Sequence, residues 1–190
     1  MSEPQRRDRW FWETYIDEQG NWNQAGKQPD GRELAALRRG LGRLAGSVPQ
    51  MWPYYRSVIP SAESPRLDAE HAALTLYGIH QQSQRHPMHR PGIGLGDALR
   101  QLKNHDGVSE EAVTRRFNAA ATATSVGELV AHLRGLITQL RGKDIALDYT
   151  RLREDLLGWI NPAGQSWVRR RWGMQYHAWH SAEADVPITD

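Results

Sequence analysis

The sequence predicts an all-α protein. Apolar residues recur at intervals of three and four along most of the chain, which is the period of an amphipathic helix. Ser and Asp residues stand just before several of these runs, where a side-chain oxygen can cap the first free N–H groups of a helix. No stretch alternates between apolar and polar residues as a half-buried strand does. Helices packed on helices are therefore the expected architecture.

The first half of the chain contains five segments of helical or turn character. The segments are a helix near 8–17 rich in aromatic residues, a helix at 32–44 with leucines at helical spacing, a short helix or turn at 49–60, a helix ending near 80, and a helix at 95–105. The fourth has the clearest start, because Ser64 is a suitable N-cap and Pro65 suits the first helical position. Polar loops are expected at 18–31 and 81–94.

The segment His105-Asp106-Gly107 is the best candidate for a boundary between two halves of the chain. Four helices are expected after it. Their signals are Ser109 as the cap of the first, a Ser125–Glu128 capping box for the second with Gly142 as its stop, Asp148 as the cap of the third, and a last helix that carries Val168, Trp172, Tyr176 and Trp179. A break at 161–164 separates the last two helices, and the tail at 183–190 is expected to fray.

Composition excludes several classes of protein. The chain has no cysteine, which excludes disulfides, thiolate zinc sites and cysteine nucleophiles. A polar N-terminus and the lack of a long apolar run predict neither a signal peptide nor a membrane span, so we expect a cytoplasmic protein. The 24 basic and 22 acidic residues nearly cancel, and because only three of the 24 are lysines, the other 21 are arginines. Arginine suits phosphate, whereas a genome biased toward arginine explains the same composition at least as well. A net charge of +2 confines any nucleic-acid surface to a local patch.

Other candidate sites are weak. The glycines at 92–96 resemble a phosphate loop, but no strand precedes them and no Gly-Lys-Ser/Thr follows, so we interpret them as a flexible loop before a helix. The pair His86/His89 spans a proline in a loop, and His177/His180 lacks an acidic third ligand at helical spacing, so we interpret both as surface or interface histidines. No nucleophile with its base, and no carboxylate pair, has motif-grade spacing. We therefore expect no metal, no cofactor and no catalytic residue.

Helical wheels place several arginines outside the apolar faces of their helices. They are Arg115, Arg116, Arg134, Arg169, Arg170 and Arg171. Two interpretations remain open for these arginines. Either they are solvated and their aliphatic stems cover the core, which their positions alone favour, or they form a stripe of side chains that binds phosphates. Arg153 is not assigned to this set. Most of the eight tryptophans lie in helical or turn segments and are interpreted as core residues, although some are candidates for base stacking.

Several segments resemble one known family in their order and spacing. The segments are 48–55, Ser64-Pro65-Arg66, 72–80, 92–99, Arg115-Arg116-Phe117, 132–137 and 147–159, with Trp172 near the end. Together they resemble the CasB family, the small subunit of the type I-E Cascade CRISPR surveillance complex, from about Phe11 to Tyr176. By this resemblance, Arg66, Arg115 or Arg116, Arg134 and one of Arg169 to Arg171 match basic positions of the family. The segment 121–125 has no arginine where some members have one, and Gly94 stands where Ser or Thr is common.

The resemblance implies two small helical bundles, residues 1–106 and 107–190, and no catalytic activity. It implies a subunit that pairs with a second copy of itself and assembles with the other Cascade subunits. Such a subunit also contacts the guide RNA and the target or displaced DNA strand. Because base pairing reads the sequence, such a subunit needs affinity only for the nucleic-acid backbone. The nucleic-acid-binding residues expected on this basis are Arg66, Arg115, Arg116, Arg134, Arg169, Arg170 and Arg171. The alternative is a helical scaffold that binds only protein, and a helical enzyme ranks third.

Overall fold

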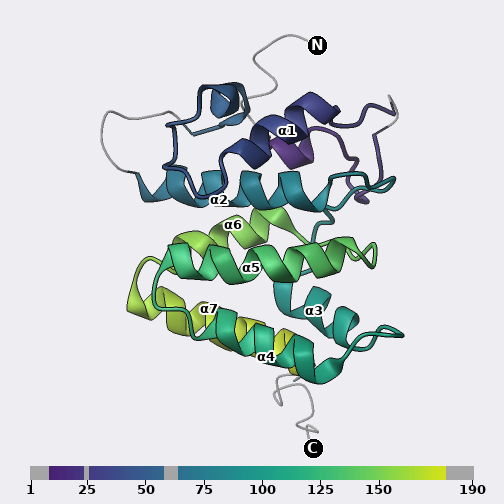
Figure 1. Ribbon diagram of the computed structural model, residues 1–190, viewed down its shortest axis with the longest axis vertical. Helices are drawn as coiled ribbons and strands as arrows, with labels where there is room; N and C mark the ends of the chain where they lie inside the picture. The colour runs from purple at the N-terminus through teal and green to yellow at the C-terminus, as the bar shows by residue number, and fades with distance from the viewer. Residues whose placement is uncertain (1–8, 24–25, 58–63, 179–190) are drawn as a thin grey trace, which may run out of the picture.

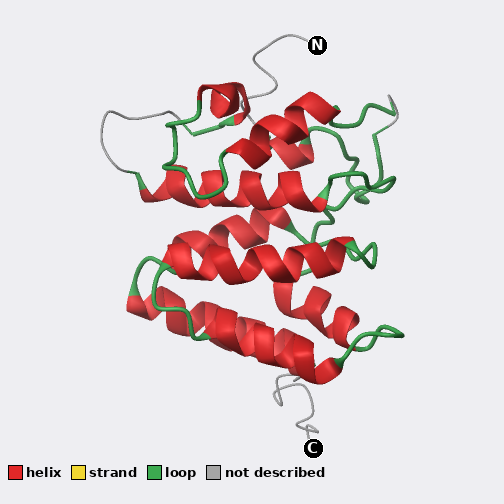
Figure 2. Ribbon diagram, viewed as in Figure 1, coloured by secondary structure: helices red, strands yellow, loops and turns green. Residues whose placement is uncertain are grey.

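The computed structural model describes residues 9–23, 26–57 and 64–178. These residues form seven α-helices, two short 3-10 helices and no β-strand, which confirms the predicted all-α fold class (Figure 2). In chain order the elements are η2 (Phe11–Glu13), α1 (Gly31–Arg39), η3 (Pro49–Tyr54), α2 (Pro65–His80), α3 (Leu95–Lys103), α4 (Glu110–Ala121), α5 (Val126–Arg141), α6 (Tyr149–Gly158) and α7 (Pro162–His177). No described helix is both long enough and apolar enough to cross a bilayer.

The helices stack in layers along the longest axis of the molecule (Figure 1). α1 lies near one end, α2 crosses beneath it, α5 and α6 form the next layer, and α3, α4 and α7 lie toward the other end. Direct packing joins α1 to α2, α2 to both α5 and α6, α4 to α5, and α3 to α7. α2 is therefore the central helix, and nearly all its side chains from Leu67 to His80 are buried.

The starts of the later helices agree with the predicted caps. The capping side chains are Ser64 for α2, Ser109 for α4, Ser125 for α5 and Asp148 for α6, and each accepts a hydrogen bond from a backbone N–H in the first turn of its helix. The predicted capping box at Ser125 is wrong in its second half. Glu128 does not return to the N–H of Ser125 but accepts from the N–H of Thr124, one residue earlier (2.8 Å).

The predicted helix near 8–17 is much shorter in the structure. Of its described residues only Phe11–Glu13 form a helical turn. The backbone groups beyond that turn bond to the following loop instead: the carbonyl of Tyr15 accepts from the N–H of Asn23, and the N–H of Asp17 donates to the carbonyl of Asn21. Pairing with the loop therefore replaces the helical hydrogen bonds that the aromatic spacing predicted.

The predicted helix at 32–44 ends early, at Arg39. Gly40 lies so close to Met51 and His71 that a Cβ would have no room, and its carbonyl is 2.9 Å from the His71 ring nitrogen Nε2. The chain turns there, and Leu44, which the spacing placed on the apolar face, is 81% exposed. The short helix predicted at 49–60 is η3, which ends at Tyr54, and positions 58–60 lie outside the described residues.

Buried residues from both halves of the sequence belong to one continuous hydrophobic cluster, which extends from Phe11 to Tyr176. α3 precedes the proposed boundary at 105–107, yet its main packing partner is α7. Helices before 106/107 therefore pack directly on helices after it. The division into two bundles at this point stays a prediction.

The tryptophans divide into a buried and an exposed group. The fully buried ones are Trp12, Trp159 and Trp172, which confirms the core interpretation for these three. That interpretation is wrong for Trp52 and Trp167, whose side chains are 53% and 56% exposed. Trp10 is partly buried, and Trp179 lies outside the described residues.

Candidate nucleic-acid interface

Three of the predicted nucleic-acid-binding residues lie on two neighbouring helices. Arg115 and Arg116 are exposed on α4, and Arg134 is exposed on α5. The opposite face of α4 is apolar: Phe117 stacks on Tyr176 of α7 with ring centres 4.3 Å apart. Because α4 and α5 pack directly on each other, the three guanidiniums come from adjoining helices (Figure 1).

The three consecutive arginines of α7 have different environments. Arg170 is exposed. Arg169 is half-buried; its guanidinium donates to the carbonyl of Ala123 (3.1 Å) and lies 5.1 Å from the centre of the Trp159 ring. Arg169 therefore ties α7 to the loop between α4 and α5, and Arg170 is the member of the run that faces solvent.

Arg171 is held by contacts within the fold. Its guanidinium pairs with the buried carboxylate of Asp155 on α6, which also accepts the indole N–H of Trp172 at 2.7 Å. Burial, together with the charge of Arg151, lowers the pKa of Arg171 to about 10, so Arg171 remains protonated at neutral pH. The exposed ring of Trp167 lies 3.9 Å from the same guanidinium. Arg171 thus joins α6 to α7 beneath a surface tryptophan.

Arg66 lies in a different part of the fold from the other predicted arginines. It is exposed in the first turn of α2, where it lines a cavity of about 400 Å³. Arg56, Arg153 and Trp10 line the same cavity. The sequence did not predict Arg56 and Arg153 at this place, because no local motif joins them to Arg66. The only signal was the wheel position of Arg153, on the flank of the apolar face of α6.

The glycine-rich segment leads into α3, as predicted, and it is closely packed. Gly94 is the N-cap residue of α3, and a Cβ at Gly94 or Gly96 would collide with α7. Gly92 has a φ of +86°, and its N–H donates to the carboxylate of Asp148 at 2.8 Å. These glycines therefore bring α3 against α7 and join the loop to the start of α6.

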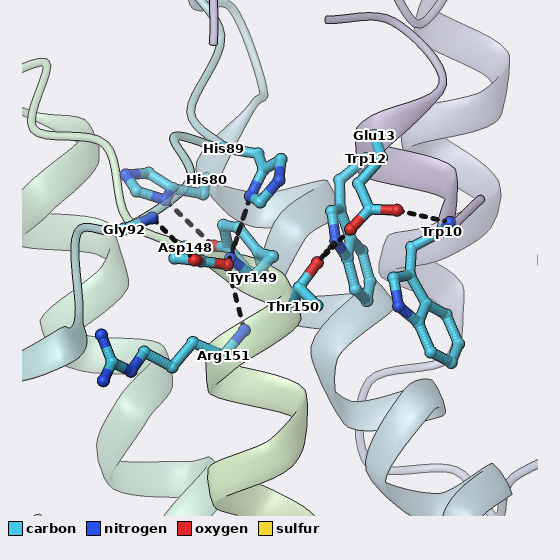
Figure 3. A network of polar contacts seen from close by, with 10 residues as sticks. All are labelled: Trp10, Trp12, Glu13, His80, His89, Gly92, Asp148, Tyr149, Thr150 and Arg151. Atoms are coloured by element: carbon cyan, nitrogen blue, oxygen red, sulfur yellow. Dashed lines mark hydrogen bonds and ion pairs between the residues drawn. The ribbon is translucent and has the colours of Figure 1, made fainter. Parts of the chain in front are cut away.

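Two buried histidines lie beside this loop (Figure 3). The backbone N–H of Tyr149 donates to Nδ1 of His89 (3.0 Å), and the Tyr149 hydroxyl is hydrogen-bonded to Nδ1 of His80 (2.9 Å). Burial lowers the pKa of His80 to about 3 and, against the opposing charge of Asp148, that of His89 to about 4. Both imidazoles are therefore neutral at physiological pH and belong to the core.

The interpretation of the histidine pairs is thus only partly right. His86 is exposed, as predicted, whereas His89 is 1% exposed and bonds to the backbone. His177 is exposed, and His180 lies outside the described residues. In the part of the chain that the structure describes, no three His, Asp or Glu side chains are grouped as a metal site would require.

Comparison with known proteins identifies the family. A model of the CRISPR-associated protein Cse2 family matches residues 33–177. This chain belongs to the Cse2 family. A curated Cse2 protein from Thermus thermophilus is 25% identical over 153 residues, which cover 80% of this chain and 82% of that protein. The crystal structure of CasB from Thermobifida fusca is 36% identical, covers 76% of this chain and 83% of that chain, and has a TM-score of 0.63.

Two further structures resemble more than nine-tenths of the chain. A Cse2-family protein from Thermus thermophilus covers 94% of this chain and 99% of its own at 22% identity, with a TM-score of 0.65, and supports the fold. A chain of a CRISPR RNA-guided surveillance complex is 25% identical, with a TM-score of 0.62 and 92% coverage of both chains. All seven predicted arginines lie within the span that matches the Cse2 family, whereas Trp10 lies outside it.

Proposed function

We propose that this Cse2-family chain is a non-catalytic subunit of a CRISPR RNA-guided surveillance complex of the Cascade type, acting in antiviral defence in the cytoplasm. In this role it contacts the other Cascade subunits and a second copy of itself. It binds the backbones of the guide RNA and of the target or displaced DNA strand, and so stabilises the hybrid and the opened duplex whatever their sequence.

The observation that carries the proposal is the similarity, over 92% of both chains, to a chain of an RNA-guided surveillance complex. The exposed arginines supply the chemistry that this role needs. Arg115, Arg116, Arg134 and Arg170 present guanidiniums to solvent, and a guanidinium binds phosphate oxygens in a bidentate manner. Arg169 and Arg171 are predicted to contribute less, because their guanidiniums already have internal partners.

Substitution of the α4 arginines tests the proposal. Each of Arg115→Ala and Arg116→Ala should weaken binding of single-stranded DNA about fivefold, the scale of one charge-assisted hydrogen bond at a surface. The slope of log affinity against log salt concentration should flatten by about 0.7 for each arginine removed. The loss should be equal for unrelated DNA sequences, because backbone contacts carry no base information. Fluorescence anisotropy at several salt concentrations measures all three effects.

The matched control is Arg39→Ala. Arg39 is exposed in the last turn of α1, toward the opposite end of the molecule from α4 (Figure 1). If Arg39→Ala weakens DNA binding as much as Arg116→Ala, the charge acts as a diffuse field and the assigned residues are wrong. If the wild-type chain assembles with the other subunits but binds no nucleic acid at low salt, the alternative of a protein-only scaffold replaces the proposal.

A further inference from the structure

The cavity beside Arg66 is lined by three arginines. Arg56 follows η3, Arg66 begins α2, and Arg153 comes from the middle of α6, and all three lie in the wall of one cavity of about 400 Å³. The guanidiniums of Arg56 and Arg153 each lie 4.5 Å from the centre of the Trp10 ring, which lines the same cavity. We call this space the Trp10 cavity. Its volume falls within the range of small-ligand sites.

Arg153 is buried and incompletely bonded. Its side chain is 7% exposed, and its Nε has no hydrogen-bond partner among the residues that the structure describes. Its Nη1 pairs with Glu154, which also lines the Trp10 cavity and is itself 54% exposed. A buried N–H of a charged group without an acceptor is unfavourable, so an added acceptor at this donor would be stabilising.

Trp10 orients two of the guanidiniums. When a guanidinium stacks on an aromatic ring, the planar face of the guanidinium contacts the ring. The N–H donors at the edge of the guanidinium then remain available to an oxyanion. The backbone at Arg56 is also fixed, because the buried carboxylate of Glu70 accepts the N–H groups of Arg56 (2.5 Å) and Ser57 (2.9 Å). The donors are therefore positioned before a ligand arrives.

The charge of the Trp10 cavity favours an oxyanion with several oxygens. Three arginines against the single carboxylate of Glu154 leave two positive charges in the wall. Like charges in one cavity wall repel one another, and an anion bound between them removes that repulsion. A carboxylate offers two oxygens and satisfies one guanidinium fork, whereas a phosphate group has enough oxygens to bond several guanidiniums at once.

We propose that the Trp10 cavity binds a phosphate group, with Arg56, Arg66 and Arg153 as the donors and Glu154 as the internal carboxylate that the ligand displaces. The phosphate is either a free or terminal phosphate group or one of a nucleic-acid backbone. The inference does not depend on the proposed function, since free phosphate is sufficient to test it and the α4 arginines take no part.

The test is a titration of the full chain with sodium phosphate against sodium chloride at equal ionic strength, with the melting temperature as the readout. Phosphate should raise the melting temperature in a saturable manner, because it binds only the folded chain. Arg66→Gln should weaken the apparent phosphate affinity about tenfold, as expected for a lost hydrogen bond to a charged group. Glu154→Gln should tighten it severalfold, because the competing carboxylate is gone; a purely structural role of Arg66 and Glu154 would not produce these opposite effects.

Arg39→Gln is the control, and it should behave as the wild type. The proposal is overturned if phosphate gives no stabilisation beyond that of chloride, if Arg39→Gln loses as much affinity as Arg66→Gln, or if Glu154→Gln leaves the affinity unchanged. A short oligothymidylate with and without a 5′-phosphate distinguishes the two sources. If only the phosphorylated oligonucleotide competes with inorganic phosphate, the site binds a terminal phosphate. If both oligonucleotides compete equally, the site binds the nucleic-acid backbone.

Discussion

The buried histidines make the stability of this fold sensitive to mild acid. His80 and His89 are 0% and 1% exposed, and their pKa values are about 3 and 4 in the folded chain against 6.5 for an unperturbed imidazole. Between pH 6.5 and these folded values, the unfolded chain binds a proton at each site and the folded chain does not. Their contribution to the free energy of unfolding is therefore complete above pH 6.5 and is lost as the pH falls.

The size of the loss follows from the pKa shifts. At pH 5 each of the two histidines should lower the free energy of unfolding by about 2 kcal/mol relative to pH 7.5. His71 acts in the same direction, since burial also lowers its pKa. A combined loss of about 4 kcal/mol or more is a large part of the stability of an ordinary domain.

Urea denaturation at pH 7.5 and pH 5 measures this loss. His89→Asn should reduce the difference between the two pH values by about 2 kcal/mol, because the amide oxygen replaces Nδ1 as an acceptor for the Tyr149 N–H and does not titrate. His86→Gln is the matched control, because His86 is exposed in the same loop and its removal should leave the difference unchanged. Equal pH dependence of the wild type and His89→Asn would refute the assignment to His89.

Two further predictions concern packing in the half of the fold that contains α7. Gly96→Ala should lower the free energy of unfolding by about 2 kcal/mol or more, because its Cβ would strike the Trp172 carbonyl. Gly135→Ala, with open space around it in α5, should leave the free energy of unfolding unchanged or raise it by up to about 1 kcal/mol, and thermal denaturation compares the two variants. Asp155→Ala should lower the free energy of unfolding by about 3 kcal/mol, because it leaves the Arg171 guanidinium and the Trp172 indole N–H without their acceptor. Urea denaturation measures this change, and a decrease below about 1 kcal/mol would contradict the buried ion pair.

Local chemistry in the sequence predicted most helix starts. Ser64 with Pro65, Ser109 and Asp148 act within one turn of their own helices, so their effect can be read without knowing the rest of the fold. Helix ends were harder to predict. α1 stops at Gly40, a glycine that weakens the predicted helix, but the close approach of Met51 and His71 to it comes from other parts of the chain and cannot be read within 32–44.

The candidate sites show the same limit. The exposure of Trp167 could have been predicted, since it lies about 140° around the helix from the buried Trp172 at 100° per residue. The burial of His89 could not, because its partner Tyr149 is distant in sequence. The presence of Arg66, Arg153 and Trp10 in the wall of one cavity likewise depends on the packing of the N-terminal segment against α6.

The small number of arginines assigned to phosphate contacts bears on how this chain would act in a complex. If Arg115, Arg116, Arg134 and Arg170 all contact phosphates, the slope of log affinity against log salt should be about −3 on a single strand. Affinity should then fall about fiftyfold between 50 and 200 mM salt, which leaves an isolated chain with weak binding at physiological salt. A second copy held beside the first makes its contacts at a high effective concentration and multiplies the affinity without new residues. The proposed pairing within the complex therefore supplies what a chain with a net charge of +2 lacks by itself, and a covalently linked dimer should bind single-stranded DNA far more tightly than the monomer.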